Sequence, residues 1–255
     1  MKTFASFLAG FALVSLCVAC DSGDSSSDTP DAAPTTVTST VLVTDWVSTE
    51  PIEGATLCLN VEGIDCVDTD AEGTATFDGE PTLGETVQMK ADKDGYFPFM
   101  VEFVVSDATA NAVGGYIMAP GLIVDVVIDE LGEEPNDEKG HAGFVVWGPA
   151  DDEGNRVQMV GATMTLDGTA SQGPKYYNLL DSLDAGLFAP DEDGTTAAGM
   201  AGFFNVDPGT VAVTVTAEGH DCSTGFTGLP GADGSVQTTV EAGRISYATV
   251  FCDAE

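Results

Sequence analysis

Basic residues are the scarcest class in this chain of 255 residues. Seven Lys and Arg stand against 42 Asp and Glu, so the net charge is −35 at pH 7. Such a surface repels phosphate, which argues against nucleic acid as a partner. It also repels anionic lipid headgroups unless a covalent anchor or divalent cations intervene. The excess of acid is typical of a protein that stays soluble in a salty or calcium-containing exterior.

Motifs for catalysis and for transition metals are also missing. The two histidines, His141 and His220, lie far apart, and the sequence has no Cys-x-x-Cys spacing, no Gly-rich phosphate loop and no nucleophile beside a base. Gly23-Asp24-Ser25 spells a short motif of serine esterases, but no strand precedes it. We therefore expect no catalytic residue and no cofactor. An enzyme built only from Asp, Glu and Ser is the alternative.

The apolar run near the N-terminus is too short to span a bilayer. Phe4–Val18 follows a single positive charge at Lys2 and is succeeded by small and polar residues, which is the layout of a secretory signal. Residues 1–19 are therefore predicted to be a signal peptide. The segment Leu16-Cys17-Val18-Ala19-Cys20 resembles the bacterial lipobox, although Cys17 stands where Leu is usual. The resemblance implies cleavage before Cys20 and diacylation of its sulfur.

This resemblance implies export and lipid anchoring to the bacterial cell envelope, with the outer membrane or the cell surface favoured. The membrane would then be a partner through the N-terminal lipid. An ordinary signal cleaved after Ala19 is the alternative, and it would leave Cys20 as a thiol. Residues 20–40 are rich in Ser, Asp, Thr, Pro and Ala, so they are predicted to be a disordered, self-repelling tether.

The rest of the chain predicts an all-β fold class, because short alternating apolar runs are separated by turns. Gly54-Ala55-Thr56-Leu57 returns as Gly161-Ala162-Thr163-Met164, and the run Gly73–Phe77 returns as Gly199–Phe203. This internal repeat predicts two small Ig-like or transthyretin-like β-sandwiches in tandem. They are expected at residues 41–132 and 141–255, with an acidic linker at 133–140. One short interdomain helix is predicted at 122–131, ending at Gly132, although its β-branched residues favour a strand.

The marks shared by both copies resemble those of the carboxypeptidase regulatory-like family. These marks are a first strand, a Gly-Ala at the next strand, a turn ending in Gly before an aromatic strand, and a valine-rich strand. The resemblance implies a transthyretin-like sandwich with a non-catalytic accessory or adhesive role. The second copy departs from the first by an insertion from Gly168 to Asp193, in which Tyr176 and Tyr177 are expected to be exposed.

Four cysteines remain after the signal and the lipidation site. Cys58, Cys66, Cys222 and Cys252 allow three pairings, of which one pair in each copy, Cys58 with Cys66 and Cys222 with Cys252, is the simplest. Disulfides are stable in exported proteins, which favours them over a zinc site.

A calcium site is the remaining candidate for a metal. Asp68, Asp70 and Glu72 alternate and are followed by Gly73, as at the start of an EF-hand loop. The twelfth position, which needs a bidentate Glu, is Gly79. A polar turn with Gly73 at positive φ is therefore the favoured interpretation, and calcium the alternative.

The expected function is that of an anchored envelope or surface protein whose sandwiches serve as non-catalytic spacers or binding domains for an unknown protein or glycan. Trp46 and Trp147, in corresponding first strands, are expected to pack in or over the sandwiches. A glycan-binding platform is the alternative for these tryptophans. The alternative function is a calcium-dependent adhesion or carbohydrate-binding protein.

Overall fold

The computed structural model describes residues 39–77, 79, 83–106, 114–134, 136–170, 172–178, 188–189 and 193–255. Within these residues the regular secondary structure is mostly β-strand, with one α-helix and one short 3-10 helix. The all-β prediction is therefore confirmed. The signal peptide, Cys20 and nearly all of the tether fall outside the described residues.

The first half, residues 39–120, forms two facing groups of strands. Its strands are β1 (Ser39–Asp45), β2 (Thr56–Leu59), β3 (Val67–Asp68), β4 (Thr74–Phe77), β5 (Thr86–Asp92), β6 (Phe99–Val104) and β7 (Gly114–Met118). Burial alternates along β5, as expected for a strand with one face on a core. Strand β6 differs, because its first four residues are all buried.

The second half, residues 140–255, repeats this plan with longer strands. Its elements are β8 (Gly140–Ala150), β9 (Arg156–Gln158), β10 (Thr163–Asp167), β11 (Gln172–Tyr176), β12 (Met200–Val206), β13 (Gly209–Thr216), β14 (His220–Thr224), β15 (Leu229–Pro230), η2 (Ala232–Gly234), β16 (Val236–Val240) and β17 (Ile245–Ala254). Strand β11 lies in the insertion and pairs with β12.

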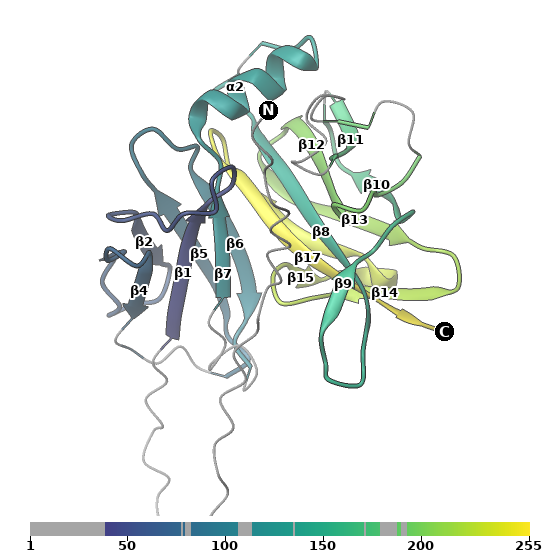
Figure 1. The fold of residues 1–255 in the computed structure, drawn as a ribbon, viewed down its shortest axis with the longest axis horizontal. Coiled ribbons are helices and arrows are strands. Elements are labelled where there is room, and N and C mark those ends of the chain that lie inside the picture. The colour runs from purple at the N-terminus through teal and green to yellow at the C-terminus, as the bar shows by residue number, and fades with distance from the viewer. Residues whose placement is uncertain are drawn as a thin grey trace, which may run out of the picture.

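One sheet runs through both halves. Its order is β11-β12-β8-β17-β6-β5-β2-β3, and the two halves meet where β17 pairs in parallel with β6. Figure 1 shows β17 and β8 running side by side, between the strands of the first half and the remaining strands of the second half. The two halves therefore share main-chain hydrogen bonding in a continuous sheet, which no pattern in the sequence predicts.

The two smaller sheets cover opposite faces of this shared sheet. In the first half, the sheet β4-β1-β7 packs on the face that carries Phe99 and Val101. In the second half, the sheet β10-β13-β16-β15 packs on the face that carries Ala248 and Val250. Near β6 and β17 both faces are covered, so Met100 and its partner Ser246 are fully buried. At this point the halves are therefore in contact face to face, as well as edge to edge through the shared sheet.

The internal repeat appears in space as two copies of one buried loop. In the first copy the Thr69 hydroxyl donates to the carbonyl of Ile52 and accepts from the N–H of Ala55. In the second copy Thr195 makes the same two contacts with Met159 and Ala162. Both threonines are nearly fully buried, at 4% and 2% exposed. The hydroxyl thus satisfies two buried backbone groups in each half.

After this loop, the chain of each half passes close to its first strand, β1 or β8, at a glycine with positive φ. Gly73 has a φ of 73° and its carbonyl accepts from Val43, whereas Gly199 has a φ of 59° and accepts from Val146. A Cβ at either glycine would come within 2.5 Å of an atom of its surroundings. Both positions therefore require glycine for conformation and for space.

The helix α2 (Gly121–Glu130) lies over the junction of the two halves, as Figure 1 shows. It buries Val124, Val127 and Ile128. The N–H of Gly132 returns to the carbonyl of Asp129, and the N–H of Glu133 returns to that of Ile128. This is a Schellman cap with Gly132 in the left-handed region, at a φ of 69°. The predicted helix and its C-cap are therefore confirmed to within one residue.

Candidate functional site: the junction between the two halves

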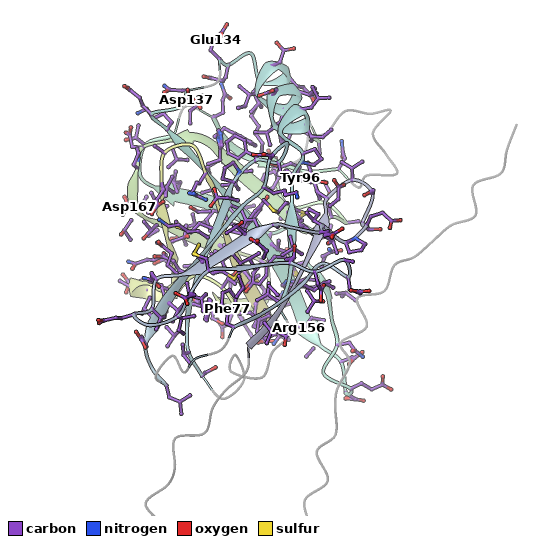
Figure 2. The ribbon with its side chains drawn as sticks, turned by 90° about the vertical axis from the view of Figure 1, so that its left-hand side faces the viewer. Phe77, Tyr96, Glu134, Asp137, Arg156 and Asp167 are labelled. Carbon is purple, nitrogen blue, oxygen red and sulfur yellow. A yellow bond between two sulfur atoms is a disulfide. The ribbon has the colours of Figure 1, made fainter. Side chains whose placement is uncertain are left out.

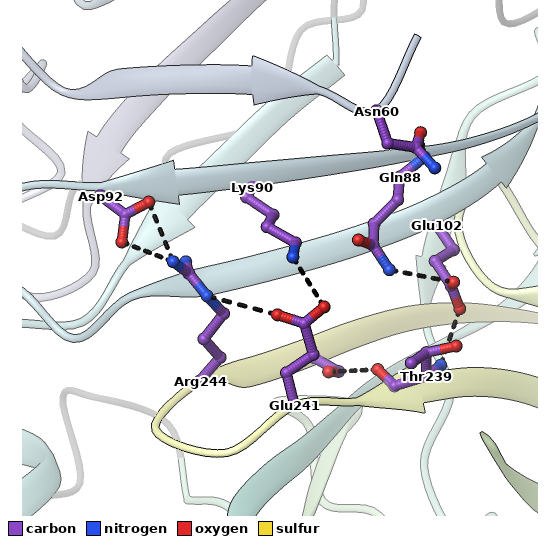
Figure 3. A network of polar contacts seen from close by, with 9 residues as sticks. Asn60, Gln88, Lys90, Asp92, Glu102, Thr239, Glu241 and Arg244 are labelled. Atoms are coloured by element: carbon purple, nitrogen blue, oxygen red, sulfur yellow. Dashed lines mark hydrogen bonds and ion pairs between the residues drawn. The ribbon is translucent and has the colours of Figure 1, made fainter. Parts of the chain in front are cut away.

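Polar residues from both halves meet on one face of the shared sheet and form a polar seam, which consists of Lys90, Asp92, Glu102, Glu241 and Arg244. Two of these residues are basic. Lys90, on β5, pairs with Glu241 at 2.7 Å, and Arg244 pairs with Asp92 at 2.8 Å (Figure 3). Arg244 also approaches Glu241, at 3.7 Å. Both cations thus join the first half to the turn that precedes β17.

Glu102, on β6, is the buried member of this seam, at 6% exposed. Its carboxylate accepts the N–H of Thr239, in the second half, at 2.7 Å and the amide of Gln88 at 3.3 Å (Figure 3). Its carbonyl accepts the N–H of Gly228 at 2.6 Å. A part-exposed ion pair contributes only about 0–1 kcal/mol. The main-chain bonds and this buried carboxylate therefore fix the junction more than the ion pairs do.

Aromatic rings from both halves fill the junction on the other side of the sheet, under α2. Trp46 meets Tyr177 edge to face, with ring centroids 5.8 Å apart. His141 lies between Phe97, from the first half, and Phe204, each with its centroid 5.5 Å away. Such ring pairs stabilise a contact by about 0.5–1.5 kcal/mol beyond the area they bury.

His141 is 5% exposed and accepts the N–H of Asn205 through Nδ1. Burial lowers the pKa of His141 to about 4, and it raises the pKa values of Tyr177 and Tyr247 at the same junction. The cavity that these rings line has a volume of about 30 Å³. One or two waters fit in that space, so the cavity does not hold a metabolite-sized ligand.

The structure contains the two predicted disulfides. Cys58 bonds to Cys66 across the hairpin of β2 and β3, and Cys222 bonds to Cys252, directly opposite on β14 and β17. The second bond ties the strand that both halves share to its neighbour, and Cys252 is fully buried. Each disulfide joins two paired strands and lies outside the aromatic junction, so we assign both a structural role.

The calcium candidates Asp68, Asp70 and Glu72 are engaged in local contacts or lie exposed. Asp68 accepts the hydroxyl of Thr56. The carboxylate of Asp70 accepts the N–H groups of Glu72 and Thr74 and so shapes the turn that ends at Gly73. This is the favoured polar turn. Across the described parts of the chain, no group of three or more His, Cys, Asp and Glu side chains is placed to hold a metal ion.

The expectation for the tyrosines of the insertion is wrong. Tyr176 is 5% exposed, and its hydroxyl oxygen accepts the N–H of Met164, at the edge of β10. Tyr177 packs between Trp46 and Phe188. Their place in an insertion suggested exposure, but Tyr176 supplies an acceptor to a strand-edge N–H and Tyr177 packs against rings of the junction. Trp46 packs over the sandwich as expected, although against a partner from the other half.

No described helix has the length and apolar character needed to cross a membrane. Cys20 lies outside the described residues, so its lipidation stays a prediction. None of the seam or junction residues apart from Trp46 was singled out for this role by the sequence. One signal could have pointed to the seam, because the chain has only seven basic residues and two of them, Lys90 and Arg244, lie there.

No family model matches the chain, and no curated protein matches it in sequence. Among solved structures, the minor pilin of Streptococcus agalactiae gives a TM-score of 0.29 at 13% identity, over 86% of this chain and 96% of that chain. The Bacillus anthracis TIE protein gives 0.26 at 13% identity, over 86% and 34%. The shaft pilin of Lactobacillus rhamnosus GG gives 0.25 at 11% identity, over 87% and 98%. TM-scores this low carry no argument about function.

Proposed function

We propose that this chain is an exported, lipid-anchored protein of the bacterial cell envelope, whose two sandwiches form one rigid, non-catalytic spacer or binding unit for a protein or glycan partner. The observation that carries the proposal is the junction, where β17 pairs with β6 and Glu102 of the first half accepts from Thr239 of the second. A unit that holds a partner at a fixed distance needs such a fixed angle between its domains.

The anchored part of the proposal rests on the sequence. A lipobox-like segment ends at Cys20, and the acidic tether after it separates the anchor from the first strand. Two or three acyl chains hold a protein stably at a membrane, whereas a single chain binds only marginally. The strong negative charge keeps the folded unit away from anionic lipid, so the lipid is the means of attachment.

The test is the intact mass of the protein solubilised from membranes in detergent. We expect a mature chain that begins at Cys20 and carries added acyl mass, and we expect both features to disappear in Cys20→Ser. The matched control is Cys17→Leu, which removes the other cysteine of the segment, places the usual residue at that position and should leave acylation intact. An unacylated chain released into the medium would contradict the anchor and leave a freely secreted two-domain protein.

A further inference from the structure

A polar cleft beside the C-terminal end of α2 has no role in the fold described above. Its volume is about 610 Å³, and its walls include Glu133, Glu134, Asp137, Lys139 and Asn205. Figure 2 shows Glu134 and Asp137 at the same end of the molecule as α2. The single cation among these residues, Lys139, is paired with Asp207. The cleft therefore presents an excess of negative charge.

Asn205 supplies an independent sign of a missing partner. Asn205 lines the cleft and is 8% exposed, and its Oδ1 is buried without a hydrogen-bond partner among the residues that the structure describes. The Nδ2 of the same amide donates to Oε2 of Glu133 at 3.2 Å. Because a carboxylate only accepts, the NH₂ group must face Glu133, and the oxygen is the end left over. A buried acceptor without a donor costs about 1–3 kcal/mol.

The carboxylate of Glu133 is held in place by two neutral amides. Oε1 accepts from Gln172 at 3.1 Å, while Oε2 accepts from Asn205. These bonds fix the carboxylate without neutralising it. The cleft thus offers a positioned negative charge next to an acceptor that lacks a donor.

We propose that this cleft binds a primary ammonium group carried on an alkyl chain, as on a lysine side chain or a free diamine. An ammonium brings positive charge to the carboxylates and three N–H donors, of which one satisfies Asn205 Oδ1. Its slender stem suits an acceptor that lies behind the cleft surface. The inference does not depend on the lipid anchor or on the spacer role.

A divalent metal fits the same groups less well. Calcium needs several oxygens within about 2.3–2.6 Å of one point. Here the Nδ2 of Asn205 faces Glu133, so that its Oδ1 and the carboxylate do not converge. Among the residues that the structure describes, no set of three acidic, His or Cys groups converges elsewhere in the cleft either. An ammonium can bridge acceptors that are several ångströms apart.

The test is calorimetric titration of the mature chain with 1,4-diaminobutane and with Nα-acetyl-lysine amide in physiological salt. Tetramethylammonium, which has the charge but no N–H, is the matched probe. We expect one saturable site for at least one of the two amines, about tenfold tighter than for tetramethylammonium. Binding of the diamine alone assigns a small polyamine as the ligand, and binding of the lysine derivative assigns a protein side chain.

Variants distinguish binding at this cleft from the general electrostatic attraction of cations to an acidic protein. Glu133→Gln and Asn205→Gly, which keeps the positive φ of 49° accessible, should each weaken binding about tenfold. Asp137→Asn, at an exposed position that does not bear on folding, should weaken it by about threefold. Asp152→Asn, an exposed neutralisation after β8, should leave it unchanged.

Three results of the amine titrations would overturn the proposal. They are the absence of a saturable site for both amines, equal affinity for tetramethylammonium, and an equal loss of affinity in Asp152→Asn. The first would mean that a trapped water suffices for Asn205, and the other two would mean diffuse attraction of cations. Binding of calcium instead, with the same dependence on Glu133, would also contradict it.

Discussion

His141 is the residue whose chemistry depends most on the closed junction. It lies between Phe97 and Phe204 and accepts the N–H of Asn205, so the fold keeps the ring neutral. Its pKa falls from the ordinary 6.5 to about 4 because burial penalises the charged form. Opening the junction would rehydrate the ring and return the pKa towards its ordinary value.

This shift makes the stability of the fold depend on pH in one direction. Above pH 6.5 His141 is neutral in both states, and its contribution is fully present. As the pH falls from 6.5 towards 4, the unfolded chain binds a proton that the folded chain does not, so stability is lost. We expect the free energy of unfolding to fall by about 3 kcal/mol over this window from this residue alone.

The comparison that isolates His141 is the slope of stability against pH in the wild type and in His141→Phe. The phenyl ring preserves the stack and does not titrate. Carboxylates titrate in both proteins, so the difference between the slopes reports the histidine. Equal slopes, measured by urea unfolding at several pH values, would show that the ring is already hydrated in the folded state.

At the scale of elements, the repeated loop around Thr69 and Thr195 closes each sandwich. Replacing either threonine by valine keeps the shape and leaves one N–H and one carbonyl buried without partners. We expect a loss of about 2–3 kcal/mol in the free energy of unfolding for each variant. Urea unfolding followed by tryptophan fluorescence measures the loss.

The matched control is Thr76→Val, on the exposed face of β4. The same chemical change there should alter stability by no more than about 0.5 kcal/mol. If Thr69→Val and Thr195→Val lower the free energy of unfolding by no more than Thr76→Val does, the two hydroxyls do not stabilise the loop. Losses that appear in two separate transitions would show that the halves unfold independently.

Local elements were predictable where a residue type has one use. At positions 73 and 199 only glycine fits, because φ is positive and the backbone lies close to a neighbouring strand. The apolar face of α2 likewise ends at a glycine, Gly132, that caps the helix. Strand β6 escaped prediction because Phe-Met-Val-Glu-Phe does not alternate. It is buried on both faces, and a strand of that kind has no period of two.

The candidate site was less predictable than the fold. Whether β17 pairs with β6 depends on sheet edges that meet only after both halves have formed, and no local pattern encodes that choice. Tyr176 and Tyr177 were expected to be exposed because they lie in an insertion that the first copy lacks. Their burial comes from contacts with residues far away in the chain, Met164 and Trp46.

At the scale of the whole molecule, the two sandwiches form one body. Strand β17 serves both halves, with its first residues on β6 and its last residues on β14. The helix and the aromatic junction cover one side of this strand, and the seam around Glu102 lies on the other. A hinge between the halves would have to break the main-chain hydrogen bonds between β17 and β6 and the bond from Gly228 to Glu102.

The most direct measurement is hydrogen exchange of two backbone amides that donate to main-chain carbonyls across the junction. Ile245 donates to Pro98, and Gly228 donates to Glu102. We expect both amides to be protected as strongly as that of Val146, which bonds within the core of the second half, so that they exchange only on global unfolding. Exchange of Ile245 and Gly228 at the rate of a turn amide such as Gly154 would contradict the account, because it would mean that the halves hinge freely.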